Sequence, residues 1–291
     1  MSASMTQTIT LQDGRKLGYT AYGVSAGKPV FYFSGGARLF GQLLHVTAAE
    51  AGVRLIALDR PGLGISDFKP GRRISDWPSD VAELADALEV KRFAVVSQSA
   101  GAAYVAVCAR QVPERLYGAA IVSGMCSFDM VNHLKNLPVA QRLTFDILRR
   151  APLWLLQLLG AQTRFLLRRY PAYYLAQMSK QLPAPDNAVL ADQATRQIVQ
   201  ESMLEAFRQG LRAYAWDMRL YVRPWGIRLE EITAPVYLWH GELDRNAPLA
   251  AVRYMAQAIP YCRAVFYPNE GHLSVMFHHG QEILEQLTAA A

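Results

Sequence analysis

The sequence has few of the features that mark disulfide-rich, metal-binding or membrane-spanning proteins. Its 291 residues include three cysteines, Cys108, Cys126 and Cys262, which lie far apart and are odd in number. Because this spacing gives no disulfide framework and no metal-ligand set, we expect small core residues there. No apolar run reaches the roughly 18 residues that a membrane-spanning helix needs, and the first residues lack the charged and apolar parts of a secretory signal. We therefore expect a cytoplasmic protein with no stable membrane insertion.

The sequence also lacks a block of basic residues, although its formal net charge is +6 at pH 7. Lys and Arg are dispersed and are not interleaved with aromatic residues, so nucleic acid is not an expected partner. Residues 125–232 hold 14 Lys and Arg against 9 Asp and Glu, and thus carry most of the excess charge. The chain is 52% hydrophobic, which is enough for a large core.

Short apolar runs alternate with helical stretches in the first half of the chain and again near its end. This alternation is typical of βαβ units around a mostly parallel sheet with helices on both faces, the α/β class. Asp13-Gly14 favours the turn of an opening hairpin. The predicted strands are 8–11, 16–20, 29–33, 53–58, 93–96, 119–122, 235–239 and 264–267, and the predicted helices are 39–51, 79–88, 250–258 and stretches after 100 and 272.

Residues 125–232 show no strand signals, and Leu, Arg, Tyr and Met recur there at helical spacing. We expect a helical insertion that divides an α/β core formed by residues 1–124 and 233–291. The apolar stretch 152–159 is flanked by arginines and is too short to cross a bilayer. Its apolar face is expected to pack over a core with the arginines in water, and attachment to a membrane surface is the alternative.

The stretch Val95-Val96-Ser97-Gln98-Ser99-Ala100-Gly101 ends an apolar run in two hydroxyls. If 93–96 is a central strand and a helix follows, Ser99 lies in a turn at the carboxyl edge of the sheet, where ligands bind. Such a turn strains the backbone at Ser99 and requires small residues two positions away, which Ser97 and Gly101 are. The hydroxyl then projects into a cleft. By itself, the pattern is equally compatible with a serine that caps a helix.

A serine nucleophile needs a base and a group that orients the base. Asp244 follows the predicted strand 235–239, in the motif Gly241-Glu242-Leu243-Asp244. His272 follows the predicted strand 264–267, in Gly271-His272. Both strands end at the edge that carries Ser99. Asp129, which follows the strand 119–122, is an alternative orienting acid.

Taken together, these motifs resemble the α/β-hydrolase superfamily over nearly the whole chain. Other matching segments are 31–36, FYFSGG, and 58–67, LDRPGLGISD. Asp59-Arg60-Pro61-Gly62 is similar to the branch that inserts a helical cap between strands, which contains proline iminopeptidases and related esterases. The resemblance implies an α/β-hydrolase fold in which the insertion covers the site and selects the substrate.

The resemblance also implies a catalytic triad, in the chain order Ser99, Asp244, His272. Ser99 would attack an acyl carbonyl, His272 would accept its proton, and Asp244 would hold the imidazole tautomer. Water would then release the acid from an acyl-enzyme. No metal or organic cofactor is implied.

The oxyanion hole implied by the resemblance consists of the backbone N–H groups of Gly36 and Ala100. The family usually has His-Gly where Ser34-Gly35 stands in this chain. A backbone donor at Gly36 does not depend on that side chain. Arg38 follows directly and is a candidate contact for an anionic substrate. A solvated arginine at a helix start is the alternative for this residue.

Several other polar residues have structural explanations. Asp59 and Arg60 are expected to form a turn and an ion pair. His240 lies at a predicted strand end and is expected to be packed. His278 and His279 are adjacent on a helix and therefore cannot face one ligand together, which argues against a metal site.

The expected function is hydrolysis of a carboxylic ester, lactone or thioester of a small molecule by a monomer or homodimer. Dehalogenases and epoxide hydrolases of this fold use an aspartate nucleophile, so Ser99 argues against both. One alternative is a prolyl aminopeptidase-like amidase, but its His-Gly-Gly-Pro-Gly loop is replaced by residues 34–38, SGGAR, and a basic insertion receives an amine poorly. The other alternative is a non-hydrolytic homologue that binds a small molecule.

Overall fold

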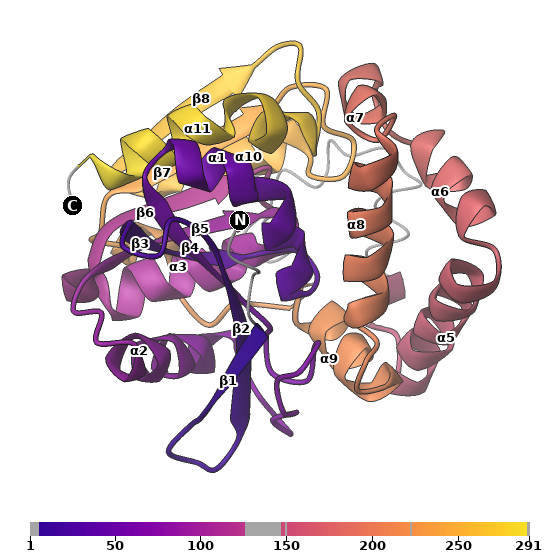
Figure 1. Cartoon of the computed structure of the whole chain (residues 1–291), viewed down its shortest axis with the longest axis horizontal. Helices are drawn as coiled ribbons and strands as arrows, with labels where there is room; N and C mark the ends of the chain where they lie inside the picture. The colour runs from indigo at the N-terminus through magenta and orange to yellow at the C-terminus, as the bar shows by residue number, and fades with distance from the viewer. Residues whose placement is uncertain (1–5, 126–146, 149, 222, 290–291) are drawn as a thin grey trace.

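The computed structural model describes residues 6–125, 147–148, 150–221 and 223–289, and is built around an eight-stranded sheet (Figure 1). The strand order is β1-β2-β4-β3-β5-β6-β7-β8. The strands are β1 (Thr6–Thr10), β2 (Lys16–Gly23), β3 (Lys28–Phe33), β4 (Val53–Leu58), β5 (Phe93–Gln98), β6 (Leu116–Val122), β7 (Val236–Gly241) and β8 (Cys262–Tyr267). Each of the eight overlaps a predicted strand, which confirms the predicted α/β class.

The pairing of the strands brings two loops together at the carboxyl edge. β1 and β2 form the expected antiparallel hairpin, and β2 is antiparallel to β4. All the remaining pairs are parallel. β3 and β5 are neighbours, with Phe33 opposite Ser97 at their carboxyl ends. The segment after β3 and the turn at Ser99 therefore begin side by side.

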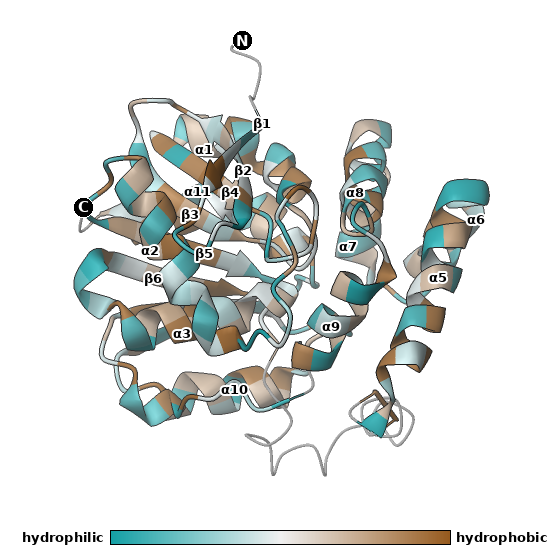
Figure 2. Ribbon diagram, turned by 90° about the horizontal axis from the view of Figure 1, so that it is seen from below, coloured by the Kyte–Doolittle hydropathy of each residue, from teal (hydrophilic) through white to brown (hydrophobic). Residues whose placement is uncertain are grey.

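Helices cover both faces of the sheet (Figure 2). α1 (His45–Glu50) and α11 (Ser274–Thr288) lie on one face, and α2 (Trp77–Ala87), α3 (Ala102–Gln111) and α10 (Leu249–Ala258) lie on the other. The helix predicted over 39–51 divides into the 3-10 helix η1 (Arg38–Leu44) and the short α1. The N-cap of η1 is Ala37, whose side chain has no acceptor for the free N–H groups of the first turn.

Each face of the sheet has its own hydrophobic core. Consecutive residues of a strand point to opposite faces, so Val95 of β5 packs in the cluster with α2, α3 and α10, whereas Val96 packs with α1 and α11. Cys108 is buried in the first of these cores, and Cys262 is partly buried against it. Cys126 lies outside the described residues.

Five α-helices lie in the described part of the chain between β6 and β7, and they are called here the insertion helices. They are α5 (Leu153–Arg169), α6 (Pro171–Ser179), α7 (Ala184–Val189), α8 (Gln193–Glu205) and α9 (Leu211–Tyr221). They stand together beside the sheet, with α7, α8 and α9 next to the core and α5 and α6 outermost (Figures 1 and 2). No strand is found among the described residues of this part of the chain.

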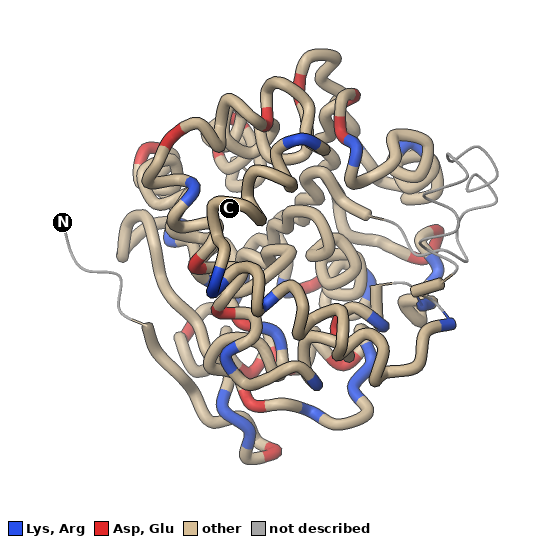
Figure 3. Tube along the Cα trace, turned by 90° about the vertical axis from the view of Figure 1, so that its right-hand side faces the viewer, with Lys and Arg blue, Asp and Glu red and all other residues tan. Residues whose placement is uncertain are grey.

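The outermost helix α5 differs from the prediction in its exposure. Leu156 and Leu167 are buried, but Trp154, Leu158 and Phe165 are 63%, 59% and 57% exposed. The expectation that the apolar side chains of this segment pack over a core is therefore only partly met. On this side of the molecule, basic and acidic positions are interspersed (Figure 3). No helix in the described ranges combines the length and apolar character needed to cross a membrane.

Candidate active site

Ser99 occupies a strained turn between β5 and α3. Its φ is 59°, in the left-handed region that non-glycine residues rarely adopt. The turn is so tight that a Cβ at Gly101 would clash with the carbonyl oxygen of Phe33 and would lie 2.8 Å from the Cβ of Ser97. Glycine at position 101 is thus required by packing. The Ser97 hydroxyl has a partner in the carbonyl of Ala120, at 3.5 Å.

Asp244 and His272 are joined across the loops that follow β7 and β8. The Nδ1 atom of His272 is 2.8 Å from Oδ2 of Asp244. The other carboxylate oxygen accepts hydrogen bonds from the backbone N–H groups of Asn246 and Ala247, at 2.7 and 2.9 Å. An ionised carboxylate can only accept, so Nδ1 carries the hydrogen and Nε2 is left as an acceptor.

Both members of this pair are buried, and their pKa values move in opposite directions. Burial alone would raise the pKa of Asp244, but the charge of His272 and the hydrogen bond from its ring outweigh burial and hold the pKa below its ordinary value. Burial alone would lower the pKa of His272, but the charge of Asp244, its hydrogen bond and the charge of Asp186 raise it. Asp244 is therefore ionised at neutral pH.

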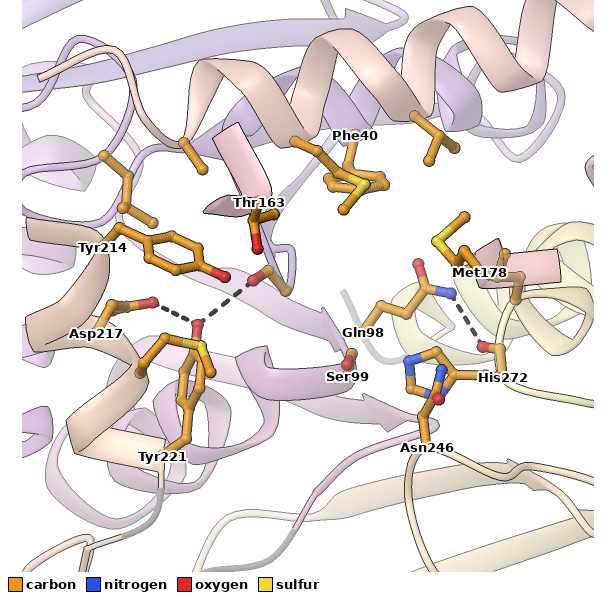
Figure 4. Close-up of a pocket in the computed structure, with 18 of the residues that line it drawn as sticks. Phe40, Gln98, Ser99, Thr163, Met178, Tyr214, Asp217, Tyr221, Asn246 and His272 are labelled. Carbon is orange, nitrogen blue, oxygen red and sulfur yellow. Dashed lines mark hydrogen bonds between the residues drawn. The ribbon is translucent and has the colours of Figure 1, made fainter. Parts of the chain in front are cut away.

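A cavity of about 290 Å³ opens between the carboxyl edge of the sheet and the insertion helices. Ser99, His272, Gly35 and Gly36 all line it. The ring of His272 is turned toward Ser99 (Figure 4). Ser99 and His272 therefore share one cavity, and Asp244 contacts the ring of His272 without itself lining that cavity.

Most of the remaining cavity wall is apolar and comes from the insertion helices. The apolar side chains from this part of the chain are Met178, Leu182, Val199, Met203, Ala206, Phe207, Tyr214 and Met218. Phe40, Leu63 and Leu273 of the core complete it. Few polar groups interrupt this lining, which is typical of a site for an apolar small molecule.

The glycine loop after β3 packs directly against the Ser99 turn. A Cβ at Gly35 would lie 3.2 Å from Cβ of Ser99 and 3.7 Å from the backbone nitrogen of Ala100. Gly36 follows and faces the cavity. The two predicted oxyanion donors, the N–H groups of Gly36 and Ala100, thus belong to adjacent segments beside Ser99.

Ser34, which replaces the usual histidine, does not leave this loop unsupported. Its hydroxyl donates to the carbonyl of Ala37 at 2.9 Å. The guanidinium of Arg60 donates to the carbonyls of Ser34 and, at 3.2 Å, of Gly35. A buried arginine therefore fixes the backbone at the position where the family usually has a histidine.

Comparison with known proteins identifies the family of the chain. A model of the alpha/beta hydrolase family matches residues 26–286. The chain belongs to this family. A hydrolase is thus the class of protein that the fold, the family and the cavity support.

Individual relatives of this hydrolase differ in what they are named for. A protein of Variovorax paradoxus (strain S110) named "Putative carbamate hydrolase RutD" is 27% identical over 88% of this chain and 89% of its own length. The esterase RhEst1 from Rhodococcus sp. ECU1013 has a TM-score of 0.69 at 22% identity, and covers 98% of both chains. The enol-lactonase from Burkholderia xenovorans LB400 has a TM-score of 0.65 at 16% identity, with 98% and 99% covered. The two structures establish a shared fold.

Arg60 of the hydrolase also joins the core to the insertion helices, a contact that the sequence did not reveal. Asp217 of α9 accepts hydrogen bonds from Arg60 at 2.9 Å, from Arg72, from Tyr104 at 3.0 Å and from Tyr221. Burial would raise the pKa of Asp217, but the charges of the two arginines hold it far below its ordinary value. Two buried arginines share one carboxylate, so this cluster carries a net positive charge beside the cavity.

Arg38 of the hydrolase is not part of the described cavity lining. Its side chain is buried, with Nη1 2.6 Å from Oδ2 of Asp59 and 2.8 Å from Oε1 of Glu205. It is therefore neither a solvated arginine nor placed to meet a substrate in this cavity. Like Arg60, it joins the core to an insertion helix, since Glu205 ends α8.

Two other histidines of the hydrolase, His240 and His278, have contacts that do not involve the cavity. His240 is buried in β7, and burial lowers its pKa to about 4, so it is neutral. His278 pairs with Glu270 at 3.0 Å. Over the described ranges, no group of three or more His, Cys, Asp or Glu side chains is arranged to hold a metal ion. Asp129 lies outside the described residues.

Two residues that contact His272 were missed at the level of sequence. Gln98 donates from Nε2 to the carbonyl of His272 at 3.2 Å (Figure 4). Its Oε1 accepts from the Tyr32 hydroxyl at 3.2 Å. Asp186 of α7 accepts from the backbone N–H of His272 at 2.8 Å. Both contacts hold the backbone of the histidine loop. Their only sequence signal is the position of Gln98 beside Ser99.

Proposed function

We propose that the chain is a serine hydrolase that cleaves a carboxylic ester, lactone or thioester through an acyl-enzyme. The observation that carries this proposal is the buried hydrogen bond between His272 and Asp244. His272 lines the same cavity as Ser99, which is held in a strained turn. A helix-capping serine has no need of such a turn or of a buried, oriented histidine.

In the proposed acylation step, Ser99 Oγ attacks the substrate carbonyl carbon while Nε2 of His272 takes the hydroxyl proton. The carbonyl π electrons move to oxygen and give an oxyanion. The N–H groups of Gly36 and Ala100 donate to it. When the tetrahedral intermediate collapses, the bond to the leaving oxygen or sulfur breaks, and His272 gives its proton to that atom.

In the proposed deacylation step, water replaces Ser99 as the nucleophile. His272 takes one proton from water as the new C–O bond forms, and later returns that proton to Ser99 Oγ as the acyl bond breaks. Asp244 stabilises the imidazolium in both steps and is itself not protonated, consistent with the direction of its pKa shift.

The cavity favours an apolar substrate, and we propose that the insertion helices act as a cap that selects it. Asp217 is the single Asp or Glu among the described residues of the lining. Because it already pairs with Arg60 and Arg72, the described part of the lining offers no free carboxylate to a substrate's ammonium group. This weighs against the aminopeptidase-like alternative.

The experiment that tests the proposal is hydrolysis of p-nitrophenyl esters of rising acyl length together with labelling by a fluorophosphonate probe. Wild type, Ser99→Ala and a matched control, Ser79→Ala, are compared. Ser79 is an exposed serine on α2. We expect turnover and labelling to vanish in Ser99→Ala only. A folded wild-type protein that neither labels nor hydrolyses any ester would favour the non-hydrolytic binding homologue instead.

A further inference from the structure

The helix that follows His272 begins without a capping side chain of its own. The first N–H groups of any helix lack partners inside that helix. The N-cap position of α11 is Leu273, whose side chain has no acceptor atom. Ser274, the next residue, already uses its hydroxyl to accept from the N–H of Gly271 at 2.7 Å. The N–H groups of His272, Leu273 and Ser274 therefore need an acceptor from elsewhere.

Asp186 of the insertion helix α7 supplies it. Its Oδ2 accepts from the N–H of His272 at 2.8 Å, and its Oδ1 accepts from Leu273 and Ser274 at 2.9 and 3.0 Å. The Asp186 side chain is completely buried. The described hydrogen bonds of this carboxylate all come from backbone N–H groups. Its negative charge is thus met by backbone N–H groups at the positive end of α11.

The contact between Asp186 and the His272 loop requires glycine at position 271. A Cβ at position 271 would lie 2.6 Å from Cγ of Asp186, too close for any side chain. The absence of a side chain lets the carboxylate approach the loop and reach three consecutive N–H groups. Gly271 and Asp186 together determine where the backbone of His272 lies.

We propose that Asp186 is a positioning residue for the base His272, so that the insertion helices hold part of the catalytic machinery and do more than cover the cavity. This inference rests on the proposed function. Asp186 touches the backbone of His272 and not the reacting atoms. It acts in two ways: it fixes the loop that aims the imidazole at Ser99, and it places a second negative charge near the ring.

The charged and titratable groups that face His272 come from three elements. Asp244 lies in the loop after β7, and Asp186 lies on α7. His240 of β7 stands behind Asp244, with its Nδ1 3.8 Å from Oδ2 of Asp244, and is neutral. The charge of Asp186 acts in the same direction as that of Asp244, so both favour the imidazolium form.

The test is a titration of the histidine rings by ¹³C-edited NMR in wild type, Asp186→Asn and a matched control, Asp192→Asn. Asp192 also accepts a hydrogen bond at a helix start, from the N–H of Thr195 at 2.7 Å, but it is exposed. The His272 signal is assigned by its loss in His272→Gln. We expect the His272 pKa to fall in Asp186→Asn and to stay at its wild-type value in Asp192→Asn.

The same variants are then assayed against pH with a p-nitrophenyl ester. The asparagine NH₂ group must face one of the three backbone donors, so the loop loses its fixed position. We expect kcat to fall about tenfold or more with little change in KM, and the acid limb of kcat/KM to move to lower pH. An unchanged His272 pKa and an unchanged acid limb would overturn the proposal, because a purely structural cap affects neither.

Two further controls keep the inference testable. If Asp186→Asn does not fold, Asp186→Ser takes its place with the same expected results, because its hydroxyl oxygen can accept while its single O–H rotates away from the backbone donors. The titration needs no turnover. If the wild-type protein hydrolyses no ester, the proposed function fails, whereas a fall in the His272 pKa in the Asp186 variant would still show that Asp186 controls this ring.

Discussion

The Nη2 atom of Arg60 donates to the carbonyl oxygen of Gly35 at 3.2 Å. That carbonyl and the N–H of Gly36 belong to the same peptide group. A charge-assisted hydrogen bond at the oxygen polarises the whole group and makes its N–H a better donor. Arg60 therefore both fixes the glycine loop and strengthens the proposed oxyanion donor at Gly36.

This relationship predicts that Arg60→Met lowers kcat by about tenfold, with a small effect on KM, because the oxyanion is present only in the transition state. The effect should be smaller than the roughly hundredfold or greater loss expected when an oxyanion donor itself is removed. The variant still leaves Asp217 paired with Arg72. Steady-state kinetics with a p-nitrophenyl ester measure the split between kcat and KM.

Arg72→Met is the matched control for Arg60→Met. Arg72 shares Asp217 and is equally buried, but its hydrogen bonds go to Asp217 and Tyr104 and not to the glycine loop. Equal losses of kcat in the two variants would mean that the buried charge cluster matters only as a whole and that the contact with the loop has no separate role.

The main elements of the fold could be predicted because their signals are local. Buried parallel strands appear in the sequence as short apolar runs. The small residues that the Ser99 turn requires lie two positions before and after Ser99. The motifs around Asp244 and His272 follow strand ends directly. A sheet then brings these loops to one edge, so no long-range information was needed to group the three residues.

The contacts between the core and the insertion helices could not be predicted in this way. Arg60 and Asp217 are 157 residues apart, and Asp186 and His272 are 86 residues apart. Nothing next to Asp186 in the sequence indicates that it binds a helix start elsewhere. The helical spacing of apolar residues likewise indicated an apolar face on α5. It did not indicate whether another element covers that face, and in the structure Trp154 is exposed.

The pair formed by Asp244 and His272 predicts the pH dependence of activity. Since the base must be neutral to accept a proton, and its pKa is raised above the ordinary value of 6.5, kcat/KM should increase with pH through a midpoint above that value. Asp244→Asn should move this midpoint to lower pH and should reduce kcat roughly ten-thousandfold, because the ring loses its tautomer and its counter-charge.

A pH profile of kcat/KM for wild type and Asp244→Asn checks this prediction. His278→Gln is the control, because His278 is an exposed histidine that pairs with a carboxylate, Glu270, outside the cavity lining. A wild-type midpoint at or below the ordinary histidine value would contradict the role assigned to the pair.

The same pKa shifts predict how this pair contributes to stability. The folded-state pKa of His272 is raised, so its contribution is complete below its unfolded-state pKa of 6.5 and is lost as pH rises through the folded-state pKa. The folded-state pKa of Asp244 is lowered, so its contribution is complete above 3.8 and is lost as pH falls through the folded-state pKa. Both contributions are therefore complete between pH 3.8 and 6.5.

Urea unfolding of wild type and His272→Gln at a series of pH values measures this contribution. The difference in unfolding free energy should be largest inside that window and should shrink above it, where activity increases. Stability and activity thus depend on opposite protonation states of one ring. A difference that grows with pH above the window would show that the imidazolium is not the form that the fold stabilises.

The apolar lining predicts that the cavity sets the length of the acyl group. Met203 of α8 lines the cavity and also packs against the small cluster of Leu182, Leu190 and Val199. Met203→Phe reduces the space, so the optimum in a p-nitrophenyl ester series should move to shorter chains. Met203→Ala enlarges it and should move the optimum to longer chains, at a cost of at most about 2 kcal/mol in stability because Met203 is only partly buried. Met203→Leu, which nearly conserves volume, should leave the optimum unchanged.

Because Met203 belongs to an insertion helix, opposite shifts of the optimum in Met203→Phe and Met203→Ala would show that these helices select the substrate. The same optimum in all three would mean that the acyl chain lies outside this cavity.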